Sequence, residues 1–366
     1  MSPPTEATTS RLLGADRRLL VCCGAGGVGK TTTAASLALA AARAGRRVLV
    51  VTIDPSRRLA ETLGVNSHPE APVRLSDERL KALGVTPPGH LSAWMLDPRQ
   101  VSDAVVKGFS RTPAEAERLL DNPIYRNLSA MVAGMQEYTA VEALHGFLKD
   151  DHYDLVVLDT PPSRDAMRFL DAPERVGGFL DRRIFSLFIP GEGGLIRRAT
   201  QALVTRVMDT AFGEQTRKDL QQFLGLFGML LDHLNRNQAE VEAFLKTPAV
   251  GFLLVTSPAR EALDEAFHFA GRTRTLGLPV AGYVLNRSLA ERAELPLPAV
   301  AAGADPHLAQ AIERLLPAAE AEQATARTHA DLARQLGDRG AVFVLPYLPQ
   351  GASELEALDR LAVALG

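Results

Sequence analysis

The sequence predicts an α/β protein, in which a doubly wound, mostly parallel sheet carries an inserted α-helical subdomain. Three observations support this fold class. Short apolar runs recur along the chain, helix-compatible stretches follow them, and two long helix-forming stretches interrupt the alternation. The runs are apolar nearly throughout rather than at alternate positions, which is typical of parallel strands with both faces covered.

Six of these runs are clear strand candidates and a seventh is weaker. The clear ones are Leu19–Cys23, Arg47–Ile53, Tyr153–Leu158, Val250–Val255, Val280–Leu285 and Ala341–Leu345, and the weaker one is Leu91–Leu96. Because helix-forming stretches alternate with them, we expect these strands to build a single sheet.

Two stretches without a convincing strand are expected to form the helical subdomain. We assign residues 98–150 and 171–247 to this insert, and residues 14–97, 151–170 and 248–366 to the sheet-bearing core. Apolar residues recur at helical spacing over Asp219–Leu245. The segment Phe185–Gly194 is expected to be a loop or a helix end, and Leu289–Gly303 a surface loop.

Composition excludes several classes of protein. Of the 366 residues, 46% are hydrophobic and 23% are charged, which is typical of a globular chain. A net charge of -3 disfavours a nucleic-acid binder, which usually shows a basic excess. The two cysteines are adjacent, with no second pair for a zinc or iron–sulfur site. No apolar run approaches the ~20 residues that span a bilayer, and residues 1–18 lack the apolar core of a signal peptide. We therefore expect a soluble cytoplasmic protein with no stable membrane insertion.

A glycine-rich loop with the phosphate-binding pattern follows the first predicted strand. The pattern GxxxxGKT occupies Gly24–Thr31, and an Ala- and Leu-rich helix is expected from about Lys30. Backbone N–H groups of such a loop form a concave anion site at the helix N-terminus. The Lys30 ammonium can bridge the terminal phosphates, and the Thr31 hydroxyl can bind magnesium. The predicted nucleotide contacts in this loop are Gly26, Gly27, Val28, Gly29, Lys30, Thr31 and Thr32.

Two carboxylates come at the ends of predicted strands. Asp159 directly follows the predicted strand Tyr153–Leu158, and the carboxyl ends of neighbouring parallel strands converge on one crevice. Asp159 can therefore hold magnesium through its water shell, as phosphate-loop hydrolases require. Asp54, after the second strand, can orient or deprotonate the attacking water. An equally good interpretation of Asp54 is a helix N-cap before Pro55.

Together these elements resemble the family of the arsenical-pump ATPase (ArsA) and of the targeting ATPase of the tail-anchored membrane-protein pathway. The resemblance extends from about Leu19 to the C-terminus. Its motifs are Gly24–Thr32, Asp54–Leu59, Asp159–Pro162, Val255–Pro258 with Glu261, Val284–Arg287 and Leu345–Pro349. It implies a single-core ATPase that binds ATP and Mg²⁺ and forms a homodimer with nucleotide at or near the interface.

The same resemblance implies roles for individual residues. Asp54 would polarise the water, with Lys30 as its catalytic partner at the phosphates, and Thr31 and Asp159 would serve the metal. Asn286 would read the adenine edge, although Asn is also common where a strand ends in a turn. The loop residues Pro346, Leu348 and Pro349 would pack against the base, although the two prolines could merely shape the loop.

One departure from the family concerns the second position of the phosphate loop. The family usually has a lysine there that crosses the dimer interface to the partner's nucleotide, whereas this chain has Ala25. Either hydrolysis is slower, or another cation stabilises the developing charge. The segments Asp54–Leu59 and Asp159–Pro162 match the family's first and second switch segments. The candidates are the switch arginines Arg57, Arg58 and Arg164. The alternative is that all three are solvated or paired locally.

The helical insert raises the question of a client. Counterparts of the pump's arsenite-binding cysteines are absent, which disfavours arsenite transport. Apolar residues of the insert could line a groove for a hydrophobic or membrane-protein client, although such a stripe is more often subdomain core. They are Phe179, Leu180, Phe185, Phe188, Met208, Phe212, Phe223, Phe227 and Met229.

Three functions remain open from the sequence. The first is a homodimeric ATP-driven switch of the resembled type. The second is a partition or positioning ATPase acting on DNA or a membrane surface, although the C-terminal stretch Ala352–Gly366 has no basic face. The third is a metabolic kinase or ligase with the same loop, for which the apolar insert offers no obvious polar pocket.

Overall fold

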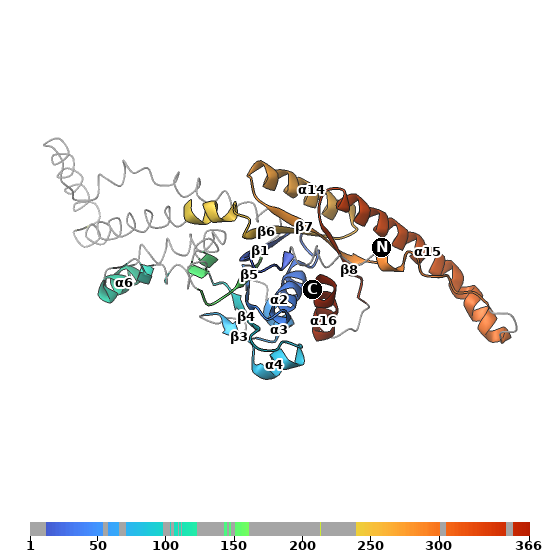
Figure 1. Cartoon of the computed structure of the whole chain (residues 1–366), viewed down its shortest axis with the longest axis horizontal. Helices are drawn as coiled ribbons and strands as arrows, with labels where there is room; N and C mark the ends of the chain where they lie inside the picture. The colour runs from blue at the N-terminus through green and yellow to red at the C-terminus, as the bar shows by residue number, and fades with distance from the viewer. Residues whose placement is uncertain are drawn as a thin grey trace. The chain divides into compact units, whose positions relative to one another are not determined.

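The chain divides into two compact units. The computed structural model describes residues 12–53, 58–65, 71–97, 103, 106–108, 110, 112–122, 143–144, 146–147, 151–160, 213, 239–300, 305–348 and 354–366. The first unit comprises Met1–Met95, His152–Ser163 and Leu245–Gly366 (Figure 1). The second comprises Leu96–Asp151 and Arg164–Phe244.

The first unit is built on an eight-stranded sheet in the order β3-β4-β2-β5-β1-β6-β7-β8 (Figure 1). The strands are β1 (Leu19–Cys23), β2 (Arg47–Thr52), β3 (Val73–Arg74), β4 (His90–Met95), β5 (Leu155–Asp159), β6 (Val250–Thr256), β7 (Val280–Ser288) and β8 (Val342–Pro346). Strands β1, β2 and β4 to β8 pair in parallel, and the short β3 pairs antiparallel with β4. The predicted α/β class with a mostly parallel sheet is confirmed.

All seven predicted runs are strands, with small shifts at their ends. β5 begins at Leu155 rather than Tyr153, and β7 continues to Ser288. The edge strand β3 was not predicted, because its two residues, Val73 and Arg74, are only partly buried or exposed and form no apolar run.

Helices cover both faces of the sheet (Figure 1). α2 (Lys30–Arg43) and α16 (Glu354–Leu365) pack together on one face. α14 (Arg260–Thr275) and α15 (Pro306–Gly337) lie against β6, β7 and β8 on the other. The remaining described helices of this unit are α3 (Arg58–Leu63), α4 (Asp77–Ala82) and the short 3₁₀ helix η1 (Ala290–Arg292).

Burial on both faces explains the continuous apolar strands. On the α2 face, alternate residues such as Leu20, Cys22 and Val50 join one core with the helix. Their neighbours in the strands, such as Val21 and Val51, are also buried. Leu358 and Leu365 of α16 are fully buried in the same core, so the C-terminal helix is a structural part of the unit.

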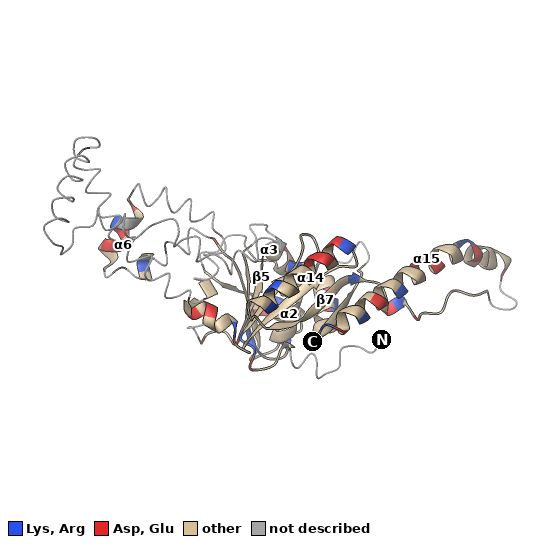
Figure 2. Ribbon diagram, turned by 90° about the horizontal axis from the view of Figure 1, so that it is seen from above, with Lys and Arg blue, Asp and Glu red and all other residues tan. Residues whose placement is uncertain are grey.

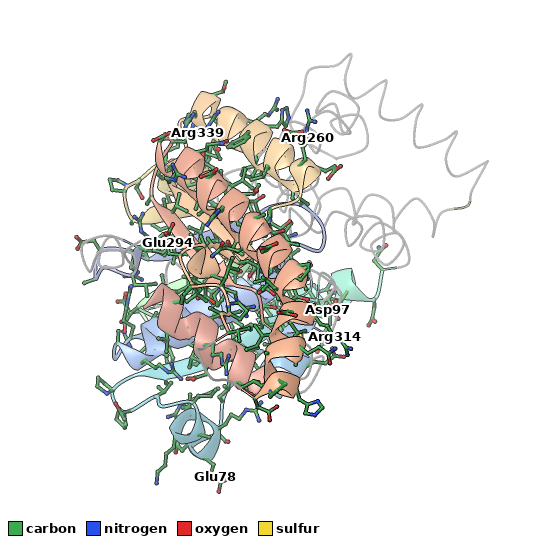
Figure 3. The ribbon with its side chains drawn as sticks, turned by 90° about the vertical axis from the view of Figure 1, so that its right-hand side faces the viewer. Glu78, Asp97, Arg260, Glu294, Arg314 and Arg339 are labelled. Carbon is green, nitrogen blue, oxygen red and sulfur yellow. The ribbon has the colours of Figure 1, made fainter. Side chains whose placement is uncertain are left out.

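The other face is closed less completely. The buried residues of α15 are Ala326, Ala333 and Leu336, whereas Leu308 and Leu315 in its first half are exposed. α14 and α15 carry charged side chains of both signs (Figure 2). After α15 ends, the Arg339 guanidinium lies 4.2 Å from the centre of the Phe267 ring of α14 and so ties the two helices together (Figure 3).

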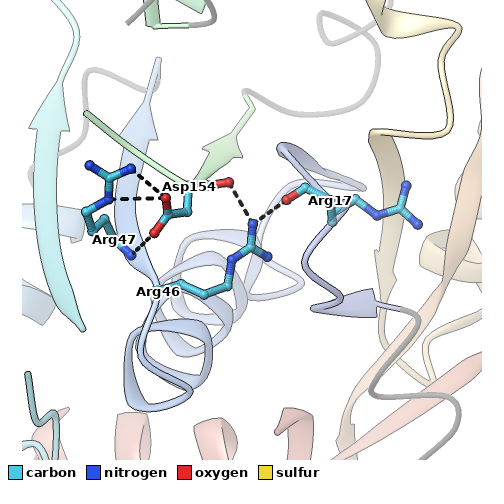
Figure 4. Close-up of polar contacts among 4 residues, drawn as sticks. All are labelled: Arg17, Arg46, Arg47 and Asp154. Carbon is cyan, nitrogen blue, oxygen red and sulfur yellow. Dashed lines mark hydrogen bonds and ion pairs between the residues drawn. The ribbon is translucent and has the colours of Figure 1, made fainter. Parts of the chain in front are cut away.

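Arginine side chains close the amino edge of the sheet (Figure 4). The Arg46 guanidinium donates hydrogen bonds to the backbone carbonyls of Leu13, Gly14, Arg17 and Asp154. Arg47 holds the Asp154 carboxylate through its backbone N–H at 2.8 Å and through its guanidinium at 2.7 and 3.1 Å. These contacts satisfy backbone carbonyl groups that precede β1 and β5.

The second unit is described only in parts. Its clearest element is α6 (Pro113–Leu120), and residues 239–244 are also helical. The predicted loop at Phe185–Gly194 and the apolar residues proposed for a client groove lie outside the described residues, as does most of the Asp219–Leu245 stripe. No helix in the described part of the chain is long and apolar enough to cross a membrane.

Candidate nucleotide site

The candidate site lies at the carboxyl edge of the central strands. β1 sits between β5 and β6, and the glycine loop Gly24–Gly29 leads from the end of β1 into α2. The chain runs from β1 through α2 to β2, which lies beyond β5, and later enters β6 on the other side. The chain therefore leaves β1 toward one side of the sheet and later returns to its other side. Open α/β sheets bind ligands at such a point, where the strand order reverses.

Two glycines of the loop are required by close approach. A Cβ on Gly24 would lie 2.0 Å from the backbone oxygen of Val255 in β6. A Cβ on Gly29 would lie 2.2 Å from Nδ2 of Asn286, and Gly29 has a left-handed backbone with φ 93°. Any other residue at either position would displace the loop from its neighbours.

The loop ends at the N-terminus of α2. Gly29 is the N-cap of this helix and has no side chain with which to bond the first-turn N–H groups. The positive end of the helix dipole and these N–H groups face the loop, which is the arrangement that binds phosphate. The predicted contacts Gly26 and Gly27 are exposed, and Thr32 is partly buried in the first turn.

Lys30 is folded back over the loop that precedes it. Its side chain is buried, and Nζ donates a hydrogen bond of 2.8 Å to the Ala25 carbonyl oxygen. The ammonium is therefore held beside the start of the loop, and the lysine of this pattern is the one that binds terminal phosphates. The side chain of Ala25 is itself buried, and it adds no positive charge at this position.

Two hydroxyl groups hold the carboxylate at the end of β5. Thr31 Oγ1 donates to Asp159 Oδ2 at 2.7 Å, and Thr52 Oγ1 donates to the same oxygen at 3.0 Å. Asp159 is 0% exposed. The predicted partners Thr31 and Asp159 therefore come together from sequence positions 128 residues apart.

Thr52 is a site residue that the sequence argument missed. It is fully buried at the last position of β2, next to Asp159 in the strand pairing. Its signal in the sequence was weak but present, since it is the polar residue in the otherwise apolar segment Val48–Ile53. Thr160 was also missed as a structural contact, and its hydroxyl donates to the Cys22 carbonyl at 2.8 Å.

The oxygen groups at this point fit a magnesium ion. Hydroxyl and carboxylate oxygens are the ligands that Mg²⁺ prefers, and water usually completes its octahedral shell. The Thr31 oxygen can bind the ion directly while its hydroxyl donates to Asp159 Oδ2 at 2.7 Å, and Asp159 can accept from water of the shell. The donor set is thus compatible with the metal that phosphate-loop hydrolases use.

Asn286 lies at the loop as well as at the end of β7. It is buried, with Nδ2 donating 2.8 Å to the Val28 carbonyl and Oδ1 accepting 2.9 Å from the Arg287 N–H. At the end of β8, Tyr347 N donates to the Ser288 carbonyl at 2.8 Å, which joins this loop to β7. Pro346 ends β8, and Leu348 packs against the core, while Pro349 lies outside the described residues. Their contacts with a base stay predictions.

Other predicted residues cannot be placed in the site. Asp54, Arg57 and Arg164 lie outside the described residues, and Arg58 is described only as the first residue of α3. The roles proposed for these four side chains therefore stay predictions.

The adjacent cysteines are unsuited to thiolate chemistry. Both are fully buried in β1. Burial raises the pKa of Cys23 to about 12, and it raises the pKa of Cys22 well above its usual range, with the nearby Asp159 charge adding to the effect. Both thiols stay protonated near neutral pH and serve as core residues.

Comparison with known proteins points to one family. The family model described as "Anion-transporting ATPase" matches residues 17–298. "ATPase GET3B" of Arabidopsis thaliana is 26% identical over 302 residues, or 79% of this chain and 69% of that protein. "ATPase ARSA1" of Chlamydomonas reinhardtii is 26% identical over 75% of this chain and 35% of that protein. "ATPase get3" of Aspergillus terreus is 32% identical over 41% of each chain. The aligned part of this chain thus spans from about a third to about two thirds of these relatives.

Proposed function

We propose that this chain, which belongs to the anion-transporting ATPase family, hydrolyses ATP with Mg²⁺ and works as a homodimeric switch. The observation that carries the proposal is the meeting of Lys30, Thr31 and Asp159 at the glycine loop. The ammonium, the hydroxyl and the carboxylate come from β1–α2 and β5 and lie at one edge of the sheet. This is the set of groups that phosphoryl transfer needs for charge compensation and metal binding.

Each group has a separate task in hydrolysis. The loop N–H groups and Lys30 bind the phosphates and stabilise the charge that develops on them. Thr31 and Asp159 would hold Mg²⁺, which supplies further charge neutralisation when bound. Asp54 is proposed to orient the attacking water. Gly26, Gly27, Val28, Gly29 and Thr32 complete the phosphate cradle.

The dimer and the client are proposed from the family resemblance. ATP would close two copies of the chain, and the helical insert would rearrange and so bind or release a hydrophobic or membrane-protein client. The relatives are named as ATPases. Any partner that they bind is a property of those proteins. The apolar residues of the second unit, such as Phe223 and Phe227, are proposed to form the client surface.

Light scattering and phosphate release test the proposed function together. The wild-type chain should sediment or elute as a dimer with Mg²⁺ and a non-hydrolysable ATP analogue, and it should release phosphate from ATP. Lys30→Ala should lower turnover by about 10³-fold, since it removes a cation that acts on the transition state. A variant that hydrolyses ATP as fast as wild type would rule out the assigned site, and a chain that stays monomeric with bound ATP would rule out the switch.

The missing lysine at Ala25 has its own test. Arg57→Ala, Arg58→Ala or Arg164→Ala should lower ATP turnover by ~10²-fold or more if that arginine supplies the positive charge. Near-wild-type rates in all three variants would show that no arginine of the switch segments replaces the lysine.

A further inference from the structure

Asn286 connects the end of β7 to the phosphate loop, 258 residues away in the sequence. The orientation of its carboxamide is fixed by chemistry. The Val28 carbonyl can only accept a hydrogen bond, so it must face Nδ2, and the Arg287 N–H can only donate, so it must face Oδ1. Both polar ends of this buried side chain are therefore used within the protein.

The bond to Val28 also fixes a donor on the loop. In a planar trans peptide the carbonyl oxygen and the N–H of the next residue point in opposite directions. When Asn286 holds the Val28 carbonyl, the Gly29 N–H is directed away from Asn286. That N–H is one of the groups with which a glycine loop binds phosphate.

The surroundings of Asn286 are built tightly around this bond. Gly29 has no Cβ, and Nδ2 of Asn286 occupies the space that a Cβ would need. A Cβ on Gly29 would lie 2.2 Å from Nδ2. On the other side, Arg287 has φ 57°, a left-handed conformation that residues other than glycine rarely adopt. Such a conformation persists where neighbouring contacts demand it, and here the Arg287 N–H bonds the Asn286 side chain.

We propose that Asn286 is a positioning residue of the phosphate loop, which directs the Gly29 N–H toward the triphosphate. This proposal rests on the proposed ATPase function and adds a second role to the predicted adenine contact. The amino group of Asn286 has two hydrogens, and the bond to Val28 uses one. The other can meet a base, so that one side chain ties the base and phosphate ends of the nucleotide together.

Magnesium tripolyphosphate separates the two roles, because it has the triphosphate but no base. Its dissociation constant and that of Mg-ATP should be measured for the wild type and for Asn286→Leu, which has nearly the same shape, adds no charge and cannot donate to Val28. We expect Asn286→Leu to weaken both ligands by similar factors, about tenfold or more. The control is Gln310→Leu, which replaces an amide by the same alkyl group at an exposed position of α15 and should change both constants less than about twofold.

A loss confined to Mg-ATP, with tripolyphosphate binding unchanged, would overturn the proposal and leave Asn286 as a base contact alone. Unchanged binding of both ligands would overturn it as well. A wild-type chain that binds neither ligand would instead contradict the proposed function. Thermal unfolding of each variant would show that the chains compared are folded.

Discussion

Two aspartates at opposite ends of β5 show how one sheet serves two purposes. Asp154, just before the strand, is bound by the Arg47 guanidinium, and its side chain is 37% exposed. Asp159, at the other end, is 0% exposed and accepts hydrogen bonds from two threonine hydroxyls. Arginine hydrogen bonds tie the Asp154 carboxylate into the fold, whereas the Thr31 hydroxyl that donates to Asp159 can also bind a cation through its oxygen. The amino edge is thus a structural closure, and the carboxyl edge can bind a ligand.

The same contrast extends to the backbone at the two edges. At the amino edge, the long, charged side chain of Arg46 donates hydrogen bonds to several carbonyl groups that precede the strands. At the carboxyl edge, glycine lets the loop backbone lie close to its neighbours, with Gly24 beside Val255 and Gly29 beside Asn286. Substitutions at the carboxyl edge should therefore change nucleotide binding, and substitutions at the amino edge should change stability.

Of the four substitutions that compare the two edges, Gly24→Ala should have the largest effect. The added Cβ would lie 2.0 Å from the Val255 oxygen, and backbone atoms on both sides must move. A shift of the loop by about 1 Å can cost about 100-fold in activity, and we expect at least that loss in ATP turnover. The matched control is Gly271→Ala in α14, where a Cβ meets open space, and turnover there should stay at the wild-type value. A Gly24→Ala variant with wild-type turnover would contradict the assigned loop geometry.

At the opposite edge, Arg46→Met should destabilise the chain without affecting the site. It removes the donor to carbonyls of the N-terminal segment and β5, at a cost of about 2–3 kcal/mol in the free energy of unfolding. Urea unfolding measures this loss. Arg260→Met, at a side chain that is 92% exposed, should change stability by about 0.5 kcal/mol or less. Weaker Mg-ATP binding by folded Arg46→Met would show that the two edges are coupled.

Thr52→Val tests the missed hydroxyl at the carboxyl edge. The nearly isosteric change removes one hydrogen bond to Asp159 and keeps the core filled. We expect the Mg²⁺ concentration for half-maximal hydrolysis to rise about tenfold, because a hydrogen bond that orients a metal-binding carboxylate is lost. Thr52→Ser should restore the wild-type value, and its failure to do so would assign the effect to packing.

The smallest effect is expected for Asp154→Asn. The Arg47 hydrogen bonds lower the pKa of Asp154, so the carboxylate contributes stability above the unfolded-state pKa, and this contribution is lost as pH falls through the folded-state pKa. The variant should be less stable than wild type at pH 7, by about 1 kcal/mol or less because the pair is partly exposed. The difference should vanish below the folded-state pKa. Urea midpoints at pH 7 and in acid measure it, and a constant difference would exclude the ion pair as its cause.

The sequence predicts the local features of this molecule better than its long-range contacts. The glycine loop, the helix that begins at Lys30 and the strand that ends at Asp159 each have a continuous sequence signature. All three are confirmed as structural elements. Contacts between distant segments have no such signature. The bond from Asn286 to Val28 depends on where β7 ends relative to the loop, and the bond from Thr52 to Asp159 depends on the register of β2 with β5. The short strand β3 has too few residues to form a pattern.

The Mg²⁺ dependence of ATP affinity in Asp159→Asn tests the central claim most directly. Calorimetric titration would give the dissociation constant of ATP with Mg²⁺ and with EDTA, for this variant and for the wild type. If Thr31 and Asp159 form the metal site, Mg²⁺ should tighten ATP binding to the wild type, and this gain should fall about tenfold or more in the variant. A variant that keeps the full Mg²⁺ dependence would contradict a magnesium–nucleotide site at the end of β5.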